Sequence, residues 1–222
     1  MNIKFSVIIT TFDVPELLVE CLESFKPSDE VEILVGIDGC EKTKKLVVDL
    51  EKKKYIRFFY FTENCGTYTV RNNLIEKTQS DIILFFDSDD IASPNIFERF
   101  NPNYDITRLK FKDFGGIKNN IEVAQGVFFI KKEILNKLVG FQDWMCNADV
   151  EFRIRALKQG IKIKQDNVIS FNRRKHSKNL TIKPETNMKS ELRKSYENIL
   201  KTKIKSKDWT NPIIKKVDYY EL

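Results

Sequence analysis

Glycine and proline, which most often interrupt regular structure, are scarce in this sequence, with eight and six among 222 residues. No repeat or low-complexity segment is present, which excludes fibrous and disordered proteins. No apolar stretch approaches the roughly 18 residues that a membrane-spanning helix needs, so we expect any membrane contact to be peripheral. The length and the 41% of hydrophobic residues instead predict one sizeable α/β domain with an appendage.

Cysteines are also few, and none of them has the spacing of a metal site. The chain also lacks a basic-then-apolar leader at its start, so we expect a cytoplasmic protein in a reducing environment. The cysteines are then expected to be buried thiols, at Cys21, Cys40, Cys65 and Cys146.

Acidic residues are sparse in the last quarter of the chain, although the net charge of +6 is modest. Lysines and arginines dominate from Arg173 onward, whereas the first half is closer to balanced. This basic tail could bind a polyanion, such as DNA or an anionic membrane surface. It could equally be a solvated helix face that keeps the protein soluble, and both interpretations stay open.

The most informative stretch runs from Asp81 to Asp90, where an apolar run stops at three carboxylates. Such a run predicts a buried parallel strand that delivers its last residues to a site. Side chains two apart on an extended chain point the same way, so Asp87 and Asp89 can present oxygens to one hard cation. The alternative is a solvated turn, because Asp and Ser are ordinary turn formers.

Strand and helix patterns alternate four times in about the first ninety residues, which predicts a mostly parallel sheet covered on both faces. Ligands of such sheets bind beyond the carboxyl ends of the strands. Four polar segments follow the predicted strands there, namely Phe12-Asp13, Asp38-Gly39, Asn64 to Gly66, and Asp87 to Asp90. These acids, without a GxGxxG motif or a Gly-rich phosphate loop, favour a metal-bridged nucleotide over a bare dinucleotide.

Local signals predict several further elements. A capping box of Asp13 and Glu16 predicts the start of the first helix. The segment from Asn101 to Asn120 is expected to hold a short strand and loops. The pattern then predicts a strand from Val123 to Ile130, followed by helices over Lys131 to Leu138 and Asn147 to Leu157. Asp149 lies at the start of the last of these, where an ordinary helix cap is the commoner explanation.

Taken together, these segments resemble the family 2 glycosyltransferases, which have the GT-A fold. The first strand and helix resemble the family's opening, with Phe12-Asp13 where the family usually has Tyr-Asn. The other matching motifs are Asp38-Gly39, Glu63-Asn64-Cys65-Gly66 with Val70-Arg71-Asn72, Asp87-Ser88-Asp89-Asp90, Ala148-Asp149 and Arg174-Lys175-His176. Their order and spacing carry the resemblance, which covers roughly residues 3 to 181.

Two positions depart from the family pattern. Ile37 replaces the first Asp of an Asp-Asp-Gly element, and Ala148 replaces the Glu that usually precedes the catalytic Asp. The first change affects part of the nucleoside contact, and the second leaves Asp149 without its usual acidic neighbour. Neither removes a residue that the chemistry requires.

The resemblance implies a metal-dependent, inverting transfer of a sugar from a nucleoside-diphosphate sugar, most simply a UDP-sugar, to an acceptor hydroxyl. It implies that Asp149 is the general base. It also implies a Mn²⁺ or Mg²⁺ ion held by Asp89, Asp87 and His176. The donor nucleotide is expected at Thr10, Phe12, Asp38, Arg71, Asp87 and Ser88. Arg174 and Lys175 are candidates for binding phosphate or acceptor.

The resemblance also divides the chain. Residues 1–181 are expected to form the GT-A domain, with a nucleotide-sugar half at 1–100 and an acceptor and catalytic half at 101–181. Residues 182–222 are expected to form a basic helical extension, whose apolar side could pack on the domain, pack on a partner subunit or dock an acceptor. The acceptor could be a saccharide, a lipid-linked glycan or a polyanion such as modified DNA.

Two other classes of protein compete with this interpretation. The first is a non-catalytic GT-A-like module that binds nucleic acid or another polyanion through the basic tail. The second is a sugar nucleotidyltransferase, which is expected to carry a Gly-rich triphosphate loop after its first strand. Thr10-Thr11-Phe12-Asp13 is not such a loop.

Overall fold

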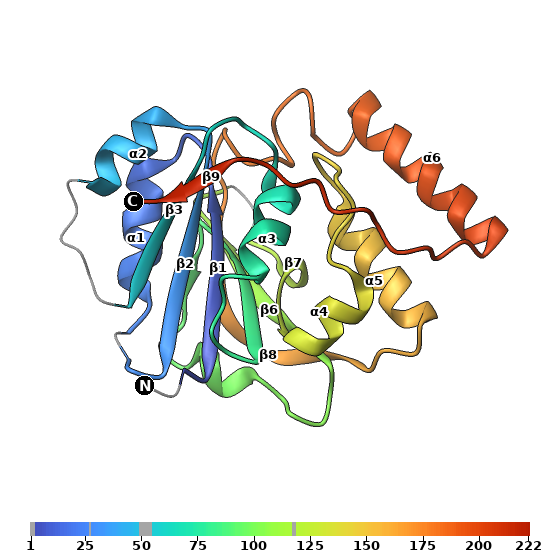
Figure 1. Ribbon diagram of the computed structural model, residues 1–222, viewed down its shortest axis with the longest axis horizontal. Helices are drawn as coiled ribbons and strands as arrows, with labels where there is room; N and C mark the ends of the chain where they lie inside the picture. Colours follow the sequence, from blue (N-terminus) through green and yellow to red (C-terminus); the bar gives the residue numbers. More distant parts are fainter. Residues whose placement is uncertain (1–2, 27, 49–54, 117–118) are drawn as a thin grey trace.

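The computed structural model describes residues 3–26, 28–48, 55–116 and 119–222. Within these residues, a nine-stranded mixed sheet has the order β5-β8-β6-β7-β4-β1-β2-β3-β9 (Figure 1). The strands are β1 (Phe5–Thr11), β2 (Val31–Asp38), β3 (Ile56–Phe61), β4 (Ile82–Asp87), β5 (Ile91–Ala92), β6 (Ile106–Phe114), β7 (Ile121–Lys131), β8 (Ile163–Arg174) and β9 (Tyr219–Glu221). The helices are α1 (Pro15–Ser24), α2 (Glu41–Val48), α3 (Thr67–Ile75), the 3₁₀ helix η1 (Ile96–Arg99), α4 (Lys132–Leu138), α5 (Ala148–Lys158) and α6 (Glu191–Ser206).

The first half of the chain supplies a parallel core of the sheet, as predicted. Strand β1 pairs in parallel with β2 and with β4, and β2 pairs in parallel with β3. In this register Thr10 lies beside Asp87. The carboxyl ends of β1, β2 and β4 therefore meet at one rim of the sheet, where the predicted site residues were expected.

The second half of the chain makes the sheet mixed. Strand β7 runs antiparallel to both β4 and β6, and β6 runs parallel to β8. The expectation of only a short strand and loops between Asn101 and Asn120 is wrong, because β6 covers Ile106–Phe114. Charged residues along β6 mask its apolar pattern, and its pairing with two neighbouring strands stabilises it.

Successive residues of the central strands face opposite layers of helix. Ile9 of β1 and Phe86 of β4 pack with α1 and α2, whereas Ile8 and Phe85 pack with α3, α4 and α5. Figure 1 shows these two layers on either side of the sheet. Because both faces are covered, β1 and β2 are buried almost along their full length.

The predicted capping box of α1 is wrong. The N-cap residue is Val14 without a side-chain cap, and Pro15 occupies the first turn. Asp13 has a positive φ of 54°, and its carboxylate accepts a 2.8 Å bond from Lys178 Nζ instead. A tertiary ion pair has therefore replaced the local cap.

The extension after residue 181 returns to the domain. Its helix α6 is joined to the domain by a stacked pair of rings, Trp144 and Tyr196, whose centroids are 4.7 Å apart. The chain then crosses the molecule, and β9 pairs antiparallel with β3 (Figure 1). All four cysteines are buried and free, as predicted. No helix in the described part of the chain is long and apolar enough to span a bilayer.

Candidate active site

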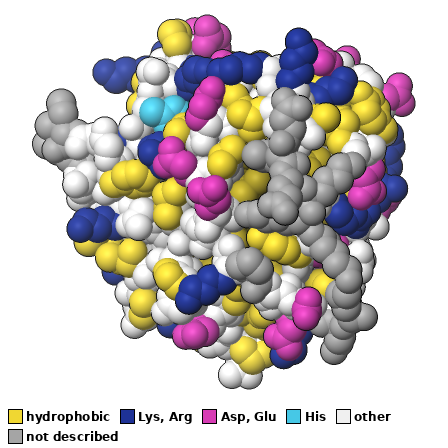
Figure 2. Space-filling view, turned by 90° about the vertical axis from the view of Figure 1, so that its left-hand side faces the viewer, with side chains coloured by type: hydrophobic (Ala, Val, Ile, Leu, Met, Phe, Trp, Pro, Cys, Tyr) yellow, Lys and Arg dark blue, Asp and Glu magenta, His cyan; other side chains and the backbone are white. Residues whose placement is uncertain are grey.

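A contact between distant parts of the chain forms the centre of the rim. His176 Nε2 lies 2.7 Å from Asp89 Oδ2, and Asn179 Nδ2 donates to the same oxygen at 2.8 Å. The side chains of Asp89 and His176 are only 20% and 18% exposed, so both still reach solvent. Figure 2 shows histidine, acidic and basic side chains gathered on this face. The contact predicted between His176 and the acidic motif is thus present.

Asp87, the last residue of β4, is held by a buried arginine. Arg71 on α3 is 1% exposed; its Nη2 donates to Asp87 Oδ1 at 2.8 Å, and its Nη1 donates to the carbonyl of Gly126 at 2.9 Å. Burial raises the pKa of Asp87, Arg71 lowers it, and the charges of Asp89 and Asp149 raise it further. Arg71 therefore holds the Asp87 carboxylate in place while its own guanidinium is almost fully buried.

Asp149 lies in the first turn of α5 and faces the same region as Asp87. A Cβ added to Gly126 would lie 3.4 Å from Asp149 Oδ2, and Gly126 is the residue whose carbonyl Arg71 binds. The buried Tyr68 lies close to Asp149; burial, followed by the charge of Asp149, raises the pKa of Tyr68. Asp149 is not the N-cap residue, which is Asn147, but its Oδ1 accepts the first-turn amide of Val150 at 2.9 Å. Its other oxygen, Oδ2, is the one that faces Gly126.

Asp38, at the end of β2, is 4% exposed and supports a loop. Its two carboxylate oxygens accept the amides of Cys65 and Gly66 at 2.7 and 3.0 Å. Burial raises the pKa of Asp38, while these two backbone bonds oppose the rise. Each oxygen keeps a second lone pair, so Asp38 can accept one further donor while it orders the start of α3.

The other predicted donor residues line the same rim. Thr10 is buried with no partner for its hydroxyl among the described residues, and Ser88 is also buried. Phe12 is 42% exposed and lies 5.5 Å from Lys183 Nζ, which approaches its ring. The segment after β8 therefore lies over the end of β1.

The two candidate phosphate-binding cations are already engaged. The Arg174 backbone amide donates to Asp90 Oδ1 at 2.9 Å, and its guanidinium pairs with Glu20. Lys175 Nζ lies 2.7 Å from Asp113 Oδ2. Both residues thus fix the end of β8 against the domain.

Sequence reasoning missed some functional neighbours. Asn179 completes the contact of Asp89 with His176, and its place three residues after the histidine was the available signal. Asp90 is 1% exposed with one oxygen unpartnered among the described residues; burial, with Asp89 and Asp87, raises its pKa far above its ordinary value. Gly126 carried no recognisable signal, because its role depends on which residues the fold brings beside it.

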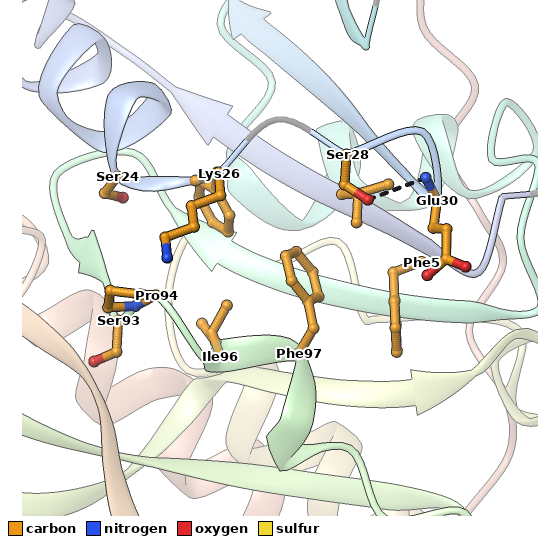
Figure 3. A pocket seen from close by; sticks show the side chains of 11 residues that line it. Phe5, Ser24, Lys26, Ser28, Glu30, Ser93, Pro94, Ile96 and Phe97 are labelled. Carbon is orange, nitrogen blue, oxygen red and sulfur yellow. Dashed lines mark hydrogen bonds between the residues drawn. The ribbon is translucent and has the colours of Figure 1, made fainter.

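A cavity elsewhere in the molecule is separate from this rim. It has a volume of about 170 Å³ and lies at the start of β1, where Phe5, Phe25, Phe97 and Lys26 are among the residues that line it (Figure 3). Asp87 pairs with Thr10 at the opposite end of β1. The cavity is therefore not part of the candidate active site.

The parallel core, with carboxylates at its carboxyl rim, defines a GT-A-type fold. The sequence profile described as Glycosyl transferase family 2 matches residues 6–135. The chain belongs to this family.

Comparisons with individual proteins agree with this assignment. The teichoic acid poly(glycerol phosphate) polymerase of Staphylococcus epidermidis is 32% identical over 107 residues, which cover 44% of this chain and 15% of that protein. Residues 1–349 of S. aureus TarS, in complex with UDP-GlcNAc, superpose with a TM-score of 0.66 at 20% identity, over 78% of this chain and 59% of that one. The mannosyltransferase PcManGT from Pyrobaculum calidifontis, with GDP-Man and Mn²⁺, gives 0.63 at 14% identity, over 78% and 57%. The chain thus spans less than two thirds of each of these proteins.

Proposed function

We propose that this protein is a metal-dependent, inverting glycosyltransferase that uses a nucleoside-diphosphate sugar. The acceptor hydroxyl attacks the anomeric carbon while the nucleoside diphosphate leaves from the opposite face. Asp149 Oδ2 removes the hydroxyl proton as general base. Asp87, oriented by Arg71, contacts the donor's sugar or ribose. The position of Asp149 close to Gly126, across from Asp87, supports this division of roles.

The donor set at Asp89 fits a divalent cation. Among the described residues, no group of three His, Cys, Asp or Glu side chains is arranged to hold a metal. His176 Nε2 and Asp89 Oδ2, however, lie 2.7 Å from each other, which brings one nitrogen and one oxygen ligand together. Mg²⁺ is commonly held by one or two protein ligands together with substrate phosphates. Asp89 and His176 would hold Mn²⁺ or Mg²⁺, with Asp87 beside them, and the bound ion would neutralise charge on the leaving diphosphate.

The nucleotide is proposed to be UDP. Asp38 lies at the end of β2 and can accept one further N–H, such as that of uracil. The TarS structure that superposes on this chain contains UDP-GlcNAc, which supports the same class of donor. Thr10, Phe12 and Ser88 would line the nucleotide, and Arg174 and Lys175 would flank the diphosphate while held by their acidic partners.

The observation that carries the proposal is the 2.7 Å contact between Asp89 and His176 at the rim shared with Asp87. Its test is UDP binding by calorimetry with and without Mn²⁺. We expect Mn²⁺ to tighten UDP binding in the native protein and to have no effect in Asp89→Ala or His176→Ala. Asp81→Ala, an exposed carboxylate change at the other end of the β4 segment, is the control and should behave as native. Equal Mn²⁺ dependence in all four proteins would refute the assignment.

A further inference from the structure

Two arginines outside the predicted site lie next to Asp149. Arg108 on β6 is 5% exposed, and its Nε donates to the carbonyl of Ala124 at 3.0 Å. Arg153 on α5 donates from Nε to Gln125 Oε1 at 3.1 Å. Arg153 follows Asp149 by four residues, so both lie on one face of α5.

Strand β7 fixes the relative positions of these groups. Three successive residues contact the three side chains in turn: Ala124 accepts Arg108, Gln125 accepts Arg153, and Gly126 faces Asp149 Oδ2. Residues two apart on a strand are separated by roughly 7 Å. Both guanidinium groups and Asp149 Oδ2 are thus gathered around three consecutive residues of β7, and the charges of Arg153 and Asp149 both act on Arg108.

Within the described part of the chain, Asp149 is the carboxylate whose charge acts on Arg108, and it makes no direct ion pair with either arginine. No ion pair formed there includes Arg108 or Arg153, whereas Arg71, Arg99, Arg155, Arg173 and Arg174 each have a carboxylate partner. Burial, followed by the charge of Arg153, lowers the pKa of Arg108 to about 10, and Asp149 opposes this. A buried arginine beside a second cation is unfavourable unless an anion joins them.

We propose that Arg108 and Arg153 bind a phosphate group of the acceptor, so that the acceptor is a hydroxyl-bearing phosphate ester. Guanidinium groups match phosphate oxygens in geometry and charge. The phosphate would lie against the two arginines while the neighbouring hydroxyl reaches Asp149. This inference rests on the proposed function, because it treats the side of the site near Asp149 as the acceptor side.

A purely structural role for Arg108 makes a different prediction. Arg108 also donates to the Val123 carbonyl at 3.4 Å, and the register of β6 against β7 shifts just after it. If Arg108 only stabilised this shift in register, replacing Arg153 would not change ligand binding. Arg153 is only partly buried and has no backbone acceptor in the described chain, so its replacement should disturb the fold little. A variant of Arg153 therefore distinguishes phosphate binding from a purely structural role of Arg108.

The experiment compares glycerol 3-phosphate with glycerol, which differ by the phosphate alone. Each is titrated into the full chain saturated with UDP and Mg²⁺, so that the donor site is filled. The ester should bind at least about tenfold more tightly than glycerol, and Arg153→Gln or Arg108→Gln should remove about tenfold of that affinity. Arg153→Lys, which keeps the charge, should recover most of it. Lys112→Gln, which removes an exposed charge from the same strand as Arg108, should change nothing.

Each other outcome has a defined meaning. Equal binding of ester and glycerol, or unchanged ester binding in a folded Arg153→Gln protein, would overturn the inference. A loss of UDP affinity in the arginine variants, with ester binding retained, would assign these residues to the donor instead and also overturn it. If UDP does not bind the native protein, the proposed function fails separately. The titrations are then repeated without UDP, and the same comparison of variants decides the inference.

Discussion

Arg71 is the residue that allows several carboxylates to share one rim. Its guanidinium is buried, and one end binds Asp87 while the other binds the carbonyl of Gly126 beside Asp149. Its Nε has no partner among the described residues. A buried charge with incomplete hydrogen bonding is costly unless its counter-ion is present. Asp87 and Arg71 should therefore be coupled in stability as well as in function.

Removing Asp87 alone should destabilise the protein, because it leaves Arg71 buried without its carboxylate. We expect Asp87→Ala to lower the free energy of unfolding by about 3 kcal/mol, measured by urea denaturation. The double variant Asp87→Ala/Arg71→Met should recover much of this loss, since the uncompensated charge is gone. Neither variant should bind UDP with native affinity. Additive losses in the double variant would show that the two side chains are not coupled.

At the scale of elements, buried ion pairs fix the second half of the sheet. Arg99 of η1 binds Asp166 of β8 through two bonds of 2.7 and 3.0 Å, and Asp166 is 2% exposed. Burial raises the pKa of Asp166, but the bonds and charge of Arg99 outweigh it, so the pKa is lowered from its ordinary value of 3.8. This pair connects η1, which follows the acidic motif, to the strand that leads to His176.

The lowered pKa predicts a pH dependence with a definite sign. A carboxylate with a lowered pKa in the folded state contributes stability above pH 3.8, and this contribution disappears as the pH falls through the folded-state pKa. Asp166→Asn should therefore be less stable than the native protein at pH 7, by about 2 kcal/mol. The difference should shrink progressively below pH 4 in urea titrations. A difference that stays constant from pH 7 down to pH 3 would contradict this assignment.

The elements also show what a sequence pattern can predict. Strands β1 to β4 are continuous apolar runs, because helices cover both of their faces, and their positions were predicted closely. Strand β6 carries Arg108, Lys110 and Lys112, so its pattern indicated only a short strand. The three residues of β9 have no pattern of their own, because pairing with β3 alone defines them.

The same distinction applies to the site. Asp87, Asp89 and His176 could be placed at one rim, because a carboxylate at the end of a buried strand and a family motif are local signals. The roles of Arg71 and Gly126 could not be predicted, because they depend on the register of β7 against β4. Asp38 was predicted to contact the donor nucleotide, and the structure adds that it fastens the loop before α3.

At the scale of the whole molecule, the basic tail is closely integrated with the domain. Lys203 of α6 binds the fully buried Glu151 of α5 at 2.9 Å, and Lys178 binds Asp13. Lys215 and Lys216 also meet acidic side chains of the first half. Much of the tail's charge is therefore neutralised internally. Binding of DNA or of an anionic membrane surface stays a proposal that depends on the remaining exposed lysines of α6.

The returning strand β9 should contribute measurably to stability. The ring of Tyr219 stacks on Phe61 with centroids 4.8 Å apart, and its hydroxyl donates to the carbonyl of Asn73. We expect Tyr219→Ala to lower the free energy of unfolding by about 2 kcal/mol, measured by urea denaturation. Tyr220→Ala is the matched control, because Tyr220 is 45% exposed and should cost less than half as much. Equal losses would show that β9 is not held by the Tyr219 ring.

The most direct test of the whole account is the turnover of Asp149→Asn, measured beside its affinity for UDP. Asp149 lies in the first turn of α5 with Oδ2 facing Gly126, whereas the pair proposed to hold the metal is Asp89 and His176. We therefore expect near-native UDP binding with Mn²⁺ and a loss of sugar transfer of at least about a hundredfold. Native transfer rates in Asp149→Asn, with the protein folded and UDP bound, would contradict the account.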